Sequence, residues 1–581
     1  MYQAASPSAT TSQQATILGH PRGLVILFLT EMWERFSYYG MRGLLILYLT
    51  QHFLFSDADS NIIYGAYTAL VYVMTIIGGT LADRYLGSRK AVTFGAILLV
   101  LGHFGMAFEG SGSRQIMTYN NAEYVLGLDG RGGDATQIIT NAQGVVSPIS
   151  FNEGATSMLI ENPGAVGLPA AVPVASYTTR VETETFYLNI LYLSLGLIIA
   201  GVGYLKANIS TIVGALYGFG DTRRDSGFTI FYMGINLGAF LASTLCGTLG
   251  IVYGWKYGFG LAGIGMVFGL TIFLRYQHWL EGRAEPPDPA QLKKKVLGPI
   301  NIELACYLTG IGIMALSMLI VMNAHVVHEG YVGILGLVIF AVLLWYAFVT
   351  CDKGEERDRM LAAIYFILAQ IPFWALFEQA GSSLNLFTDR LVDRTMFGWS
   401  VPAPVFQSLN AMFIVIFAPL MAWLWIALAR RKLNPPAPVK FALGVFMAGL
   451  GFLALVAGIK LSGPSGMTAV GFIFLIYWIH TIGELMVSPV GLSAVTKLAP
   501  AKAVGMTMGA WFLYSGLANY LSGVIAATTG AETIGGQLTD TVAAKATYVD
   551  VYSSVGYISI GVAVVMLLIS PLIRKMMHGT D

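Results

Sequence analysis

Four charged side chains lie within an apolar stretch that is long enough to cross a membrane. Glu31, Glu34, Arg35 and Arg42 interrupt residues 24–50, which are otherwise mostly apolar or aromatic. A charged side chain at the centre of a bilayer costs about 2.5 kcal/mol or more. At about 100° per residue, the four positions share one face of a helix. This face is predicted to line a wet cavity on an ion or substrate path; the alternative is a salt-bridge cluster that only holds helices together.

The charged residues in apolar stretches differ in sign between the two halves of the chain. Apart from the two glutamates above, the first half carries the cations Arg35, Arg42 and Lys206, whereas the second half carries Glu378 and Glu484. A zwitterion with a free carboxylate and a free amine would meet complementary charges where the halves face each other. A single Asn or Tyr in a spanning helix more often makes an interhelical hydrogen bond than a ligand contact. Only the whole set of residues therefore indicates a binding site. Hydrogen-bonding groups and aromatic walls for such a ligand are available from Tyr39, Tyr72, Asn236, Asn410, Trp374, Trp511 and Phe512.

Residue patterns for other chemistry are weak or missing from the sequence. The three cysteines lack ligand spacing, and His325 and His328 lack a third ligand. His103 and His480 lie in apolar stretches, where a hydrogen-bonded core histidine is the main alternative to a proton shuttle. No nucleotide-binding or hydrolase motif occurs. We therefore expect no enzyme activity, no metal site and no cofactor.

The composition is that of a polytopic membrane protein. Of the 581 residues, 55% are hydrophobic and 11% are charged, against about 25% charged in soluble domains. The mean hydropathy is +0.66. A net charge of +1 gives no electrostatic basis for nucleic acid as a partner. The first 20 residues lack the pattern of a cleaved signal peptide.

The apolar stretches predict an all-α protein with fourteen transmembrane helices. An even number of crossings places both termini on one side. The loops on that side, with the tail, hold 22 of the 33 Lys and Arg residues, and the opposite loops hold 8. This excess predicts that both termini are cytoplasmic. The expected spans are 24–50, 61–82, 90–109, 186–210, 226–250, 257–277, 300–322, 331–351, 360–381, 405–429, 440–460, 468–492, 502–526 and 551–574.

The expected domain organisation is two six-helix bundles separated by a linker and an additional helical hairpin. Residues 111–185 would form a non-cytoplasmic insert, either a small folded lobe or a mobile loop, because about 75 residues are too many for a simple connection. The Pro-rich and charged linker suits an exposed boundary. The expected boundaries are 1–23 for the N-terminal tail, 24–280 for the first bundle, 281–299 for the linker, 300–351 for the hairpin, 352–575 for the second bundle and 576–581 for the C-terminal tail.

Residues 79–90 resemble the signature loop GxxxDRxxGRK of the major facilitator superfamily. The segment reads GTLADRYLGSRK and lies in the expected cytoplasmic turn between the second and third helices. The resemblance implies the major facilitator fold, with Asp83, Arg84 and Arg89 in a loop that controls conformational change. Asp83 is expected to cap a helix or to pair across a bundle interface.

The charged stripe resembles a family signature as well. EMWERFSYYG at residues 31–40 is similar to the ExxERFxYYG motif of the proton-dependent oligopeptide transporter (POT, or PTR) family. Both halves contain further segments that match patterns of this family, at residues 203–208, 228–240, 373–379, 406–410 and 483–485.

This resemblance implies a proton-coupled symporter that imports di- and tripeptides across a bacterial inner membrane. Arg35 and Lys206 would hold the peptide carboxylate, and Glu484 would hold the amino terminus. Glu31 and Glu34 would couple protons through ion pairs with Arg35 and Lys206. The implied partners are short peptides, protons and the lipid bilayer, and the implied functional unit is a monomer.

One further role and two alternatives remain at this point. Glu378 is expected to pair with Arg42 in a proton-sensitive outer gate. The same scaffold would also accommodate another anionic or zwitterionic solute, such as nitrate, an amino-acid conjugate or a peptide-like drug. A membrane-embedded enzyme or receptor would require a nucleophile–base or metal constellation, which the sequence does not contain.

Overall fold

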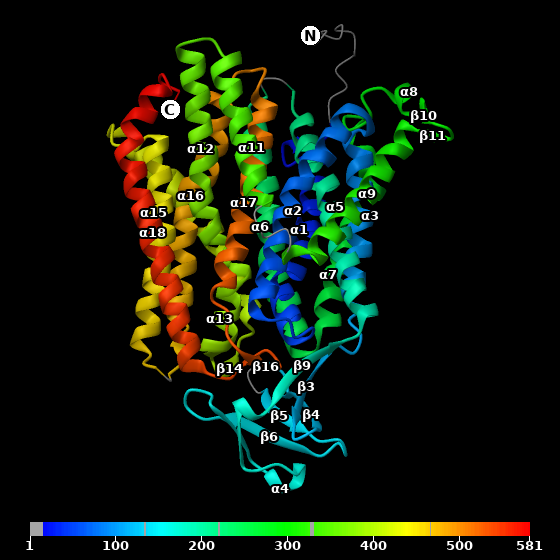
Figure 1. Cartoon of the computed structure of the whole chain (residues 1–581). Coiled ribbons are helices and arrows are strands. Elements are labelled where there is room, and N and C mark those ends of the chain that lie inside the picture. The colour runs from blue at the N-terminus through cyan, green and yellow to red at the C-terminus, as the bar shows by residue number, and fades with distance from the viewer. Residues whose placement is uncertain (1–14, 133–134, 219–220, 326–330, 465, 581) are drawn as a thin grey trace.

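The computed structural model describes residues 15–132, 135–218, 221–325, 331–464 and 466–580 (Figure 1). Long helices form from the apolar stretches, because a helix satisfies its backbone hydrogen bonds internally. They are α1 (Gly23–Gln51), α2 (Asp57–Leu81), α3 (Ser88–Met106), α5 (Thr185–Ala215), α6 (Arg224–Val252), α7 (Trp255–Tyr276), α9 (Ile302–Met322), α11 (Tyr331–Trp345), α12 (Glu355–Phe377), α14 (Ser408–Arg430), α15 (Ala437–Leu461), α16 (Gly471–Leu498), α17 (Val504–Ala527) and α18 (Thr541–Met576).

Within the described ranges, twelve helical segments are long and apolar enough to cross a membrane. The helices α1 and α17 are not among them, because α1 carries the four charges and α17 carries Ser515, Asn519 and Ser522. Both are enclosed by other helices: α1 packs against α6 and α7, and α17 packs along α2. Their polar side chains are therefore sheltered from a surrounding bilayer.

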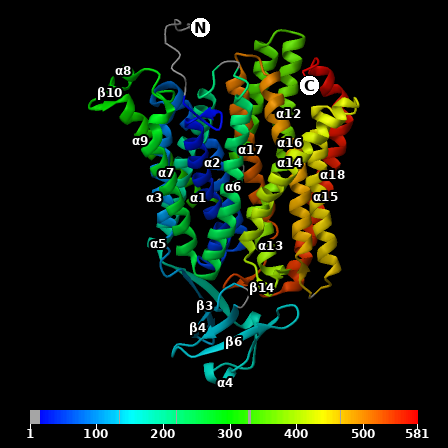
Figure 2. The same ribbon diagram turned by 180° about the vertical axis from the view of Figure 1, so that it is seen from behind.

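The long helices form two groups that stand next to each other (Figures 1 and 2). The first contains α1, α2, α3, α5, α6 and α7, and the second contains α12 and α14–α18. The groups meet where α2 packs on α17 and where α6 packs on α14. We call the end at which α1 begins and α18 ends the terminal side, and the opposite end, which carries a β-sheet lobe, the lobe side.

The span that contains α12 extends beyond the predicted end at residue 381. After α12, the 3-10 turn η6 (Glu378–Gly381) leads into α13 (Ser383–Leu391). A Cβ atom at Gly381 would lie 1.8 Å from the Tyr64 hydroxyl oxygen, so any other residue there would have to displace the Tyr64 side chain. The chain therefore bends closely around Tyr64 at the level of Glu378 and continues to the lobe side.

The additional hairpin contacts both groups of helices. The helix α9 packs against α5 and α2, and the Tyr204 hydroxyl donates to the Cys306 carbonyl at 2.6 Å. The helix α11 packs against α17, where the Tyr514 hydroxyl donates to the Gly336 carbonyl at 2.8 Å. Each helix of the hairpin is thus attached to a different half.

Residues 113–183 form a folded lobe with a seven-stranded antiparallel sheet of order β8-β7-β6-β5-β4-β3-β9. Its core contains the fully buried side chains of Met117, Ile139, Met158 and Val172. The sequence left open whether this insert is a small folded lobe or a mobile loop, and in the structure it is a folded lobe. The strands are β3 (Ser113–Tyr119), β4 (Ala122–Asp129), β5 (Thr136–Thr140), β6 (Val146–Phe151), β7 (Ser157–Ile160), β8 (Ala171–Pro173) and β9 (Thr178–Thr183), and the short helix α4 spans Pro163–Val166.

The lobe belongs to the first half in sequence but also contacts the second half. The hairpin of β16 (Thr533–Ile534) and β17 (Gln537–Leu538) connects α17 to α18. Ile534 is buried in the core of the lobe. The Gln137 amide donates to the Gln537 carbonyl at 3.2 Å, and Gln115 accepts from the Gly535 N–H at 3.3 Å. The lobe therefore bridges the two halves at their lobe-side ends.

The remaining elements are short. They are β1 (Thr16–Ile17), β2 (His20–Pro21), η1 (Ala82–Leu86), η3 (Val174–Ser176), η4 (Gln277–Leu280), α8 (Pro289–Leu292), β10 (Lys295–Leu297), β11 (Ile300–Asn301), η5 (Tyr346–Thr350), β12 (Val392–Asp393), β13 (Thr395–Met396), β14 (Trp399–Ser400), η7 (Ala403–Gln407) and β15 (Thr468–Ala469).

Candidate functional site

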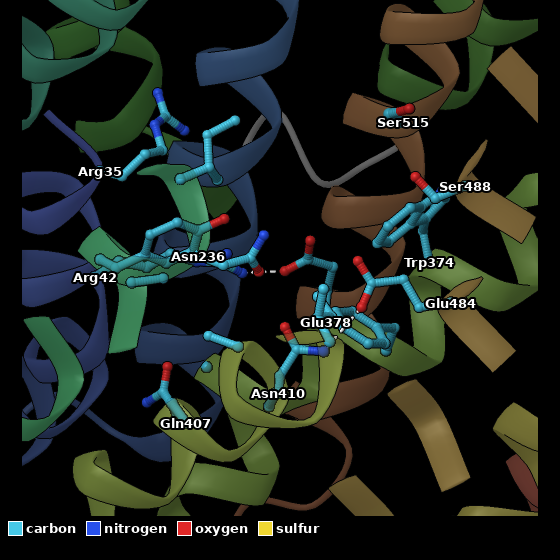
Figure 3. Close-up of a pocket in the computed structure, with 18 of the residues that line it drawn as sticks. Arg35, Arg42, Asn236, Trp374, Glu378, Gln407, Asn410, Glu484, Ser488 and Ser515 are labelled. Atoms are coloured by element: carbon cyan, nitrogen blue, oxygen red, sulfur yellow. Dashed lines mark hydrogen bonds and ion pairs between the residues drawn. The ribbon is translucent and has the colours of Figure 1, made fainter. Parts of the chain in front are cut away.

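A cavity of about 330 Å³ lies between the two halves (Figure 3). Side chains of α1, α2, α5 and α6 line one wall, and side chains of α12, α14, α16 and α17 line the other. From the predicted site, the lining includes Glu31, Arg35, Tyr39, Arg42, Tyr72, Lys206, Asn236, Trp374, Glu378, Asn410, Glu484, Trp511 and Phe512. Glu34 lies behind this wall and is fully buried. The loop residues Asp83, Arg84 and Arg89 lie elsewhere, on the terminal side.

The charged stripe of α1 forms a compact ionic cluster. The Arg35 Nε atom lies 3.2 Å from Glu31 Oε1 and is also hydrogen-bonded to the Glu34 carboxylate. In the described structure, three buried polar atoms of this cluster have no hydrogen-bond partner: Glu31 Oε2, Glu34 Oε1 and Arg35 Nη2. Buried polar groups without a partner are costly, so the cluster has capacity for a ligand, a proton or water.

Lys206 contributes a second cation to the same wall of the cavity. Its ammonium group lies 4.1 Å from the centroid of the Tyr72 ring, which is a cation–π contact. Among the described residues, no carboxylate lies within 4.0 Å of Lys206, so the expected ion pair with Glu31 or Glu34 is absent from this conformation. The reason is local: Arg35 is one helical turn from Glu31 and adjacent to Glu34, and it takes both carboxylates.

Arg42 and Glu378 form an ion pair across the two halves (Figure 3). The Arg42 Nε atom also donates to the Tyr64 hydroxyl at 2.8 Å. Glu378 is positioned by the end of α12, where the helix gives way to η6. The pair lies at the level where α12 bends, between the central cavity and the lobe side.

Glu484 supplies a carboxylate on the wall opposite to the Arg35 cluster (Figure 3). Its Oε2 atom accepts a hydrogen bond from Asn410 Nδ2 at 2.8 Å, and the same amide contacts Thr481 Oγ1 at 3.1 Å. Trp374 lies next to this carboxylate in the cavity wall (Figure 3). The cavity thus has cations on one side and an oriented carboxylate on the other.

Polar residues beyond those predicted from the sequence also line the cavity. Ser488 follows Glu484 by four residues on α16, and Tyr232 precedes Asn236 by four residues on α6. Helical periodicity would have identified both, because residues four apart share a helix face. Gln407 belongs to the segment 406–410, which matches a family pattern, and it also lines the cavity. His480 lines the cavity with its Nε2 atom 3.0 Å from the Ala448 carbonyl, as in a hydrogen-bonded core histidine.

On the lobe side, hydrogen bonds and ion pairs close the space between the halves. Arg390 binds the Asp57 carboxylate at 2.7 and 2.9 Å, and both side chains are almost fully buried. Gln51 donates to Asp389 at 2.9 Å, and the Asn385 amide donates to a backbone carbonyl of α1 at 2.9 Å. The structure is therefore closed at the lobe side.

On the terminal side, the central cavity adjoins a second cavity of about 720 Å³. Tyr232, Ser488 and Leu492 line both cavities. The second cavity extends between α14, α15, α16 and α18, and its lining includes Lys440, Lys497 and Arg574 at the terminal-side ends of the last three. The hollow space that begins at the central cavity thus continues toward the terminal side.

The signature loop contacts the linker between the halves. Arg89 donates to the Glu285 carboxylate at 2.6 and 2.9 Å, and these hydrogen bonds lower the pKa of Glu285. Gly87 has a φ of +75°, and a Cβ atom there would lie 2.5 Å from the backbone nitrogen of Pro286. Asp83 and Arg84 are exposed, and no ion pair of Asp83 occurs in the part of the chain that the structure describes. The expected pairing of Asp83 is thus missing in this conformation.

Comparisons with known proteins agree with this architecture. The model of the POT family matches residues 89–541. The chain is 33% identical to the uncharacterized transporter YclF of Bacillus subtilis, over 97% of each protein. It is 31% identical to a di-/tripeptide transporter of Lactococcus lactis, over 97% of this chain and 98% of that protein. A crystal structure of a peptide transporter POT in complex with sulfate matches with a TM-score of 0.73 and 32% identity, over 97% of this chain and 98% of the other. The chain therefore belongs to the POT family of membrane transporters.

Proposed function

We propose that this protein is a proton-coupled symporter of di- and tripeptides that works by alternating access. The observation that carries the proposal is the charge arrangement of the central cavity: Arg35 lies across the cavity from Glu484, and Lys206 of α5 also lines the cavity. A short peptide is a zwitterion whose ends match these charges. The name of the Lactococcus lactis relative, a di-/tripeptide transporter, supports the same cargo.

The peptide carboxylate binds to Arg35 and Lys206. Arg35 Nη2 is buried and has no hydrogen-bond partner among the described residues, so a carboxylate oxygen would satisfy it. The peptide amino terminus binds to Glu484, which Asn410 holds in place. Peptide-bond atoms meet Tyr39, Tyr72 and Asn236, and the peptide side chains pack against Trp374, Trp511 and Phe512.

Proton coupling operates through the ionic cluster on α1 and the ion pair between the halves. Protonation of Glu31 or Glu34 removes a negative charge that holds Arg35, so the guanidinium becomes available to the peptide carboxylate. Protonation of Glu378 removes the attraction to Arg42 and favours opening of the lobe side. No cofactor is required for either step.

The proposed topology has fourteen transmembrane helices and cytoplasmic termini. The distribution of Lys and Arg between the loops supports the orientation. Residues 24–280 and 352–575 are the two bundles, 281–299 the linker and 300–351 the hairpin, and the lobe lies on the non-cytoplasmic side. The signature loop with Asp83, Arg84 and Arg89 changes its contacts during transport. The protein acts as a monomer in a bacterial inner membrane.

Uptake into proteoliposomes tests this function. Under an inward pH gradient, a labelled dipeptide should accumulate above its external concentration, and a protonophore should abolish the accumulation. Unlabelled di- and tripeptides should compete with the label. Competition by nitrate or amino-acid conjugates, without competition by peptides, would instead support another anionic or zwitterionic cargo. Uptake that does not depend on the gradient would contradict proton coupling.

A further inference from the structure

A groove of about 700 Å³ lies at the lobe side, separate from the central cavity. Its walls are the strand β9, the turn that contains Leu54 and Phe55, and the segment around the β16–β17 hairpin. The lobe, the first half and the second half therefore all contribute to it. The Asp57–Arg390 closure lies directly beneath, since the backbone N–H of Ala531, a groove residue, donates to Asp57 at 3.2 Å.

The strand β9 presents an unpaired edge at this groove. It is the last strand of the sheet and pairs only with β3. In the described residues, its backbone makes no backbone hydrogen bond outside that ladder. Figure 1 shows β9 on the side of the lobe nearest the membrane helices. Such an edge offers N–H and C=O groups to an additional extended chain.

The side chains of β9 that face the groove alternate along the strand. Thr179, Val181 and Thr183 line the groove, whereas Arg180 and Glu182 pair with each other on the opposite face. Val181 remains 44% exposed although its face continues the core face of the lobe. The core side of the sheet is thus left uncovered at this edge.

The groove combines apolar walls with negative charge. Phe55, Phe151 and Val181 contribute apolar surface, and Asp59 and Glu532 contribute carboxylates. Its lining, as far as the structure describes it, contains no Lys, Arg or His, although the exposed ring of a histidine, His325, lies 3.6 Å from the Asp59 carboxylate. Burial and, to a smaller extent, the Glu532 carboxylate raise the pKa of Tyr177, which also lines the groove. This environment favours a cationic group over an anionic one.

We infer that the groove is an entrance subsite that binds a short peptide in extended form along β9, with its amino terminus at Asp59 and Glu532. Backbone pairing is independent of the peptide sequence, and the apolar walls accept different side chains. A peptide bound here lies outside the closed lobe side, next to the Asp57–Arg390 ion pair. The inference rests on the proposed function for the choice of a peptide as the ligand.

A fluorescence titration of the full-length protein tests the subsite. The three native cysteines are buried, so Thr179→Cys can be labelled selectively with an environment-sensitive maleimide dye. Adding a tripeptide with a free amine should give a saturable change at position 179, and the N-acetylated tripeptide should bind about three to five times more weakly, as expected for loss of a partly exposed ion pair. The same dye at Thr178→Cys, on the opposite face of β9, is the matched control and should respond little. Equal responses at 178 and 179, or none at 179, would overturn the inference.

Two further measurements separate the subsite from the central cavity and from the proposed function. In the double variant Arg35→Gln/Glu484→Gln, which should lose central binding, the response at 179 should persist; its disappearance would show that the dye reports only a distant event. Asp59→Asn/Glu532→Gln should weaken the response about three- to fivefold, and Glu161→Gln, an exposed glutamate of the lobe outside the groove, should not. Uptake measured in parallel decides between the two proposals: peptide uptake without a response at 179 refutes the subsite alone, and a response without peptide uptake refutes the transport function alone.

Discussion

The ion pair between Asp57 and Arg390 is predicted to keep the lobe side closed. The two side chains join α2 to α13 through two hydrogen bonds of 2.7 and 2.9 Å, and they are only 2% and 1% exposed. In Asp57→Asn the guanidinium would remain buried without a counter-charge whenever the lobe side is closed. The variant should therefore favour the conformation in which the lobe side is open.

The size of the shift follows from this burial. Removing one partner of a buried ion pair costs about 3–5 kcal/mol. Asparagine keeps one hydrogen-bond acceptor, which puts the expected cost near the lower end. In the open conformation water reaches Arg390, so the cost falls mainly on the closed conformation. At about 1.4 kcal/mol per factor of ten, the equilibrium should shift at least about 100-fold. A closed conformation favoured about 99 to 1 would then be populated about as much as the open one.

Double electron–electron resonance can measure this shift. Phe186 at the start of α5 and Leu461 at the end of α15 are 65% and 79% exposed and lie at the lobe-side ends of different halves. Spin labels at cysteines introduced there should report a single short distance in the parent protein. With Asp57→Asn, a second and longer distance should appear with about half of the population.

Arg394→Gln is the matched control for this experiment. Arg394 is also a buried arginine near the lobe side, but its hydrogen bonds to the carbonyls of Val401 and Asp389 and its ion pair with the Asp389 carboxylate, at 3.4 Å, all stay within the same half. Its loss should lower stability without changing the distance between the halves. If Asp57→Asn leaves the distance distribution unchanged, or if Arg394→Gln changes it equally, the pair does not hold the lobe side closed.

Four further predictions concern individual carboxylates. Glu378→Gln should lengthen the lobe-side distance in the same way, as low pH should in the parent protein, because Arg42 loses its ionised partner; an unchanged distribution would contradict the outer gate. Glu484→Gln should weaken binding of free dipeptides by about tenfold or more but change that of N-acetylated ones little, as measured by competition; equal losses would exclude a role in binding the amine. Glu31→Gln should abolish accumulation driven by a pH gradient yet retain exchange of internal for external peptide, and accumulation at the parent level would exclude it from coupling. Glu285→Gln should lower thermal stability by no more than about 1 kcal/mol, since the pair is partly exposed; because the folded-state pKa of Glu285 is lowered, the difference should be present at neutral pH and vanish as the pH falls through the acidic range.

The sequence alone predicted the long helices and the charged wall of the cavity. An apolar stretch must become a helix in lipid, because only internal hydrogen bonds satisfy its backbone there. The contact between Glu31 and Arg35 could also be predicted from the sequence, because residues four apart meet on one helical face. The matches of residues 31–40 and 483–485 to family patterns added the expectation of a facing carboxylate at Glu484.

Only the tertiary structure decided which distant groups meet. Asp57 and Arg390 are 333 positions apart in the chain, and nothing in their local sequence marks them as partners. The sequence likewise could not predict the sheet of residues 113–183 or its hydrogen bond with Gly535. Strand pairing depends on contacts with neighbouring strands, which exist only in the folded sheet. Lys206 was expected to pair with a carboxylate and instead lies over Tyr72, since Arg35, on the same helix as both glutamates, reaches them first. Helical periodicity determines which side chains share one face of a helix. The packing of the helices determines which side chain of another helix each of them contacts.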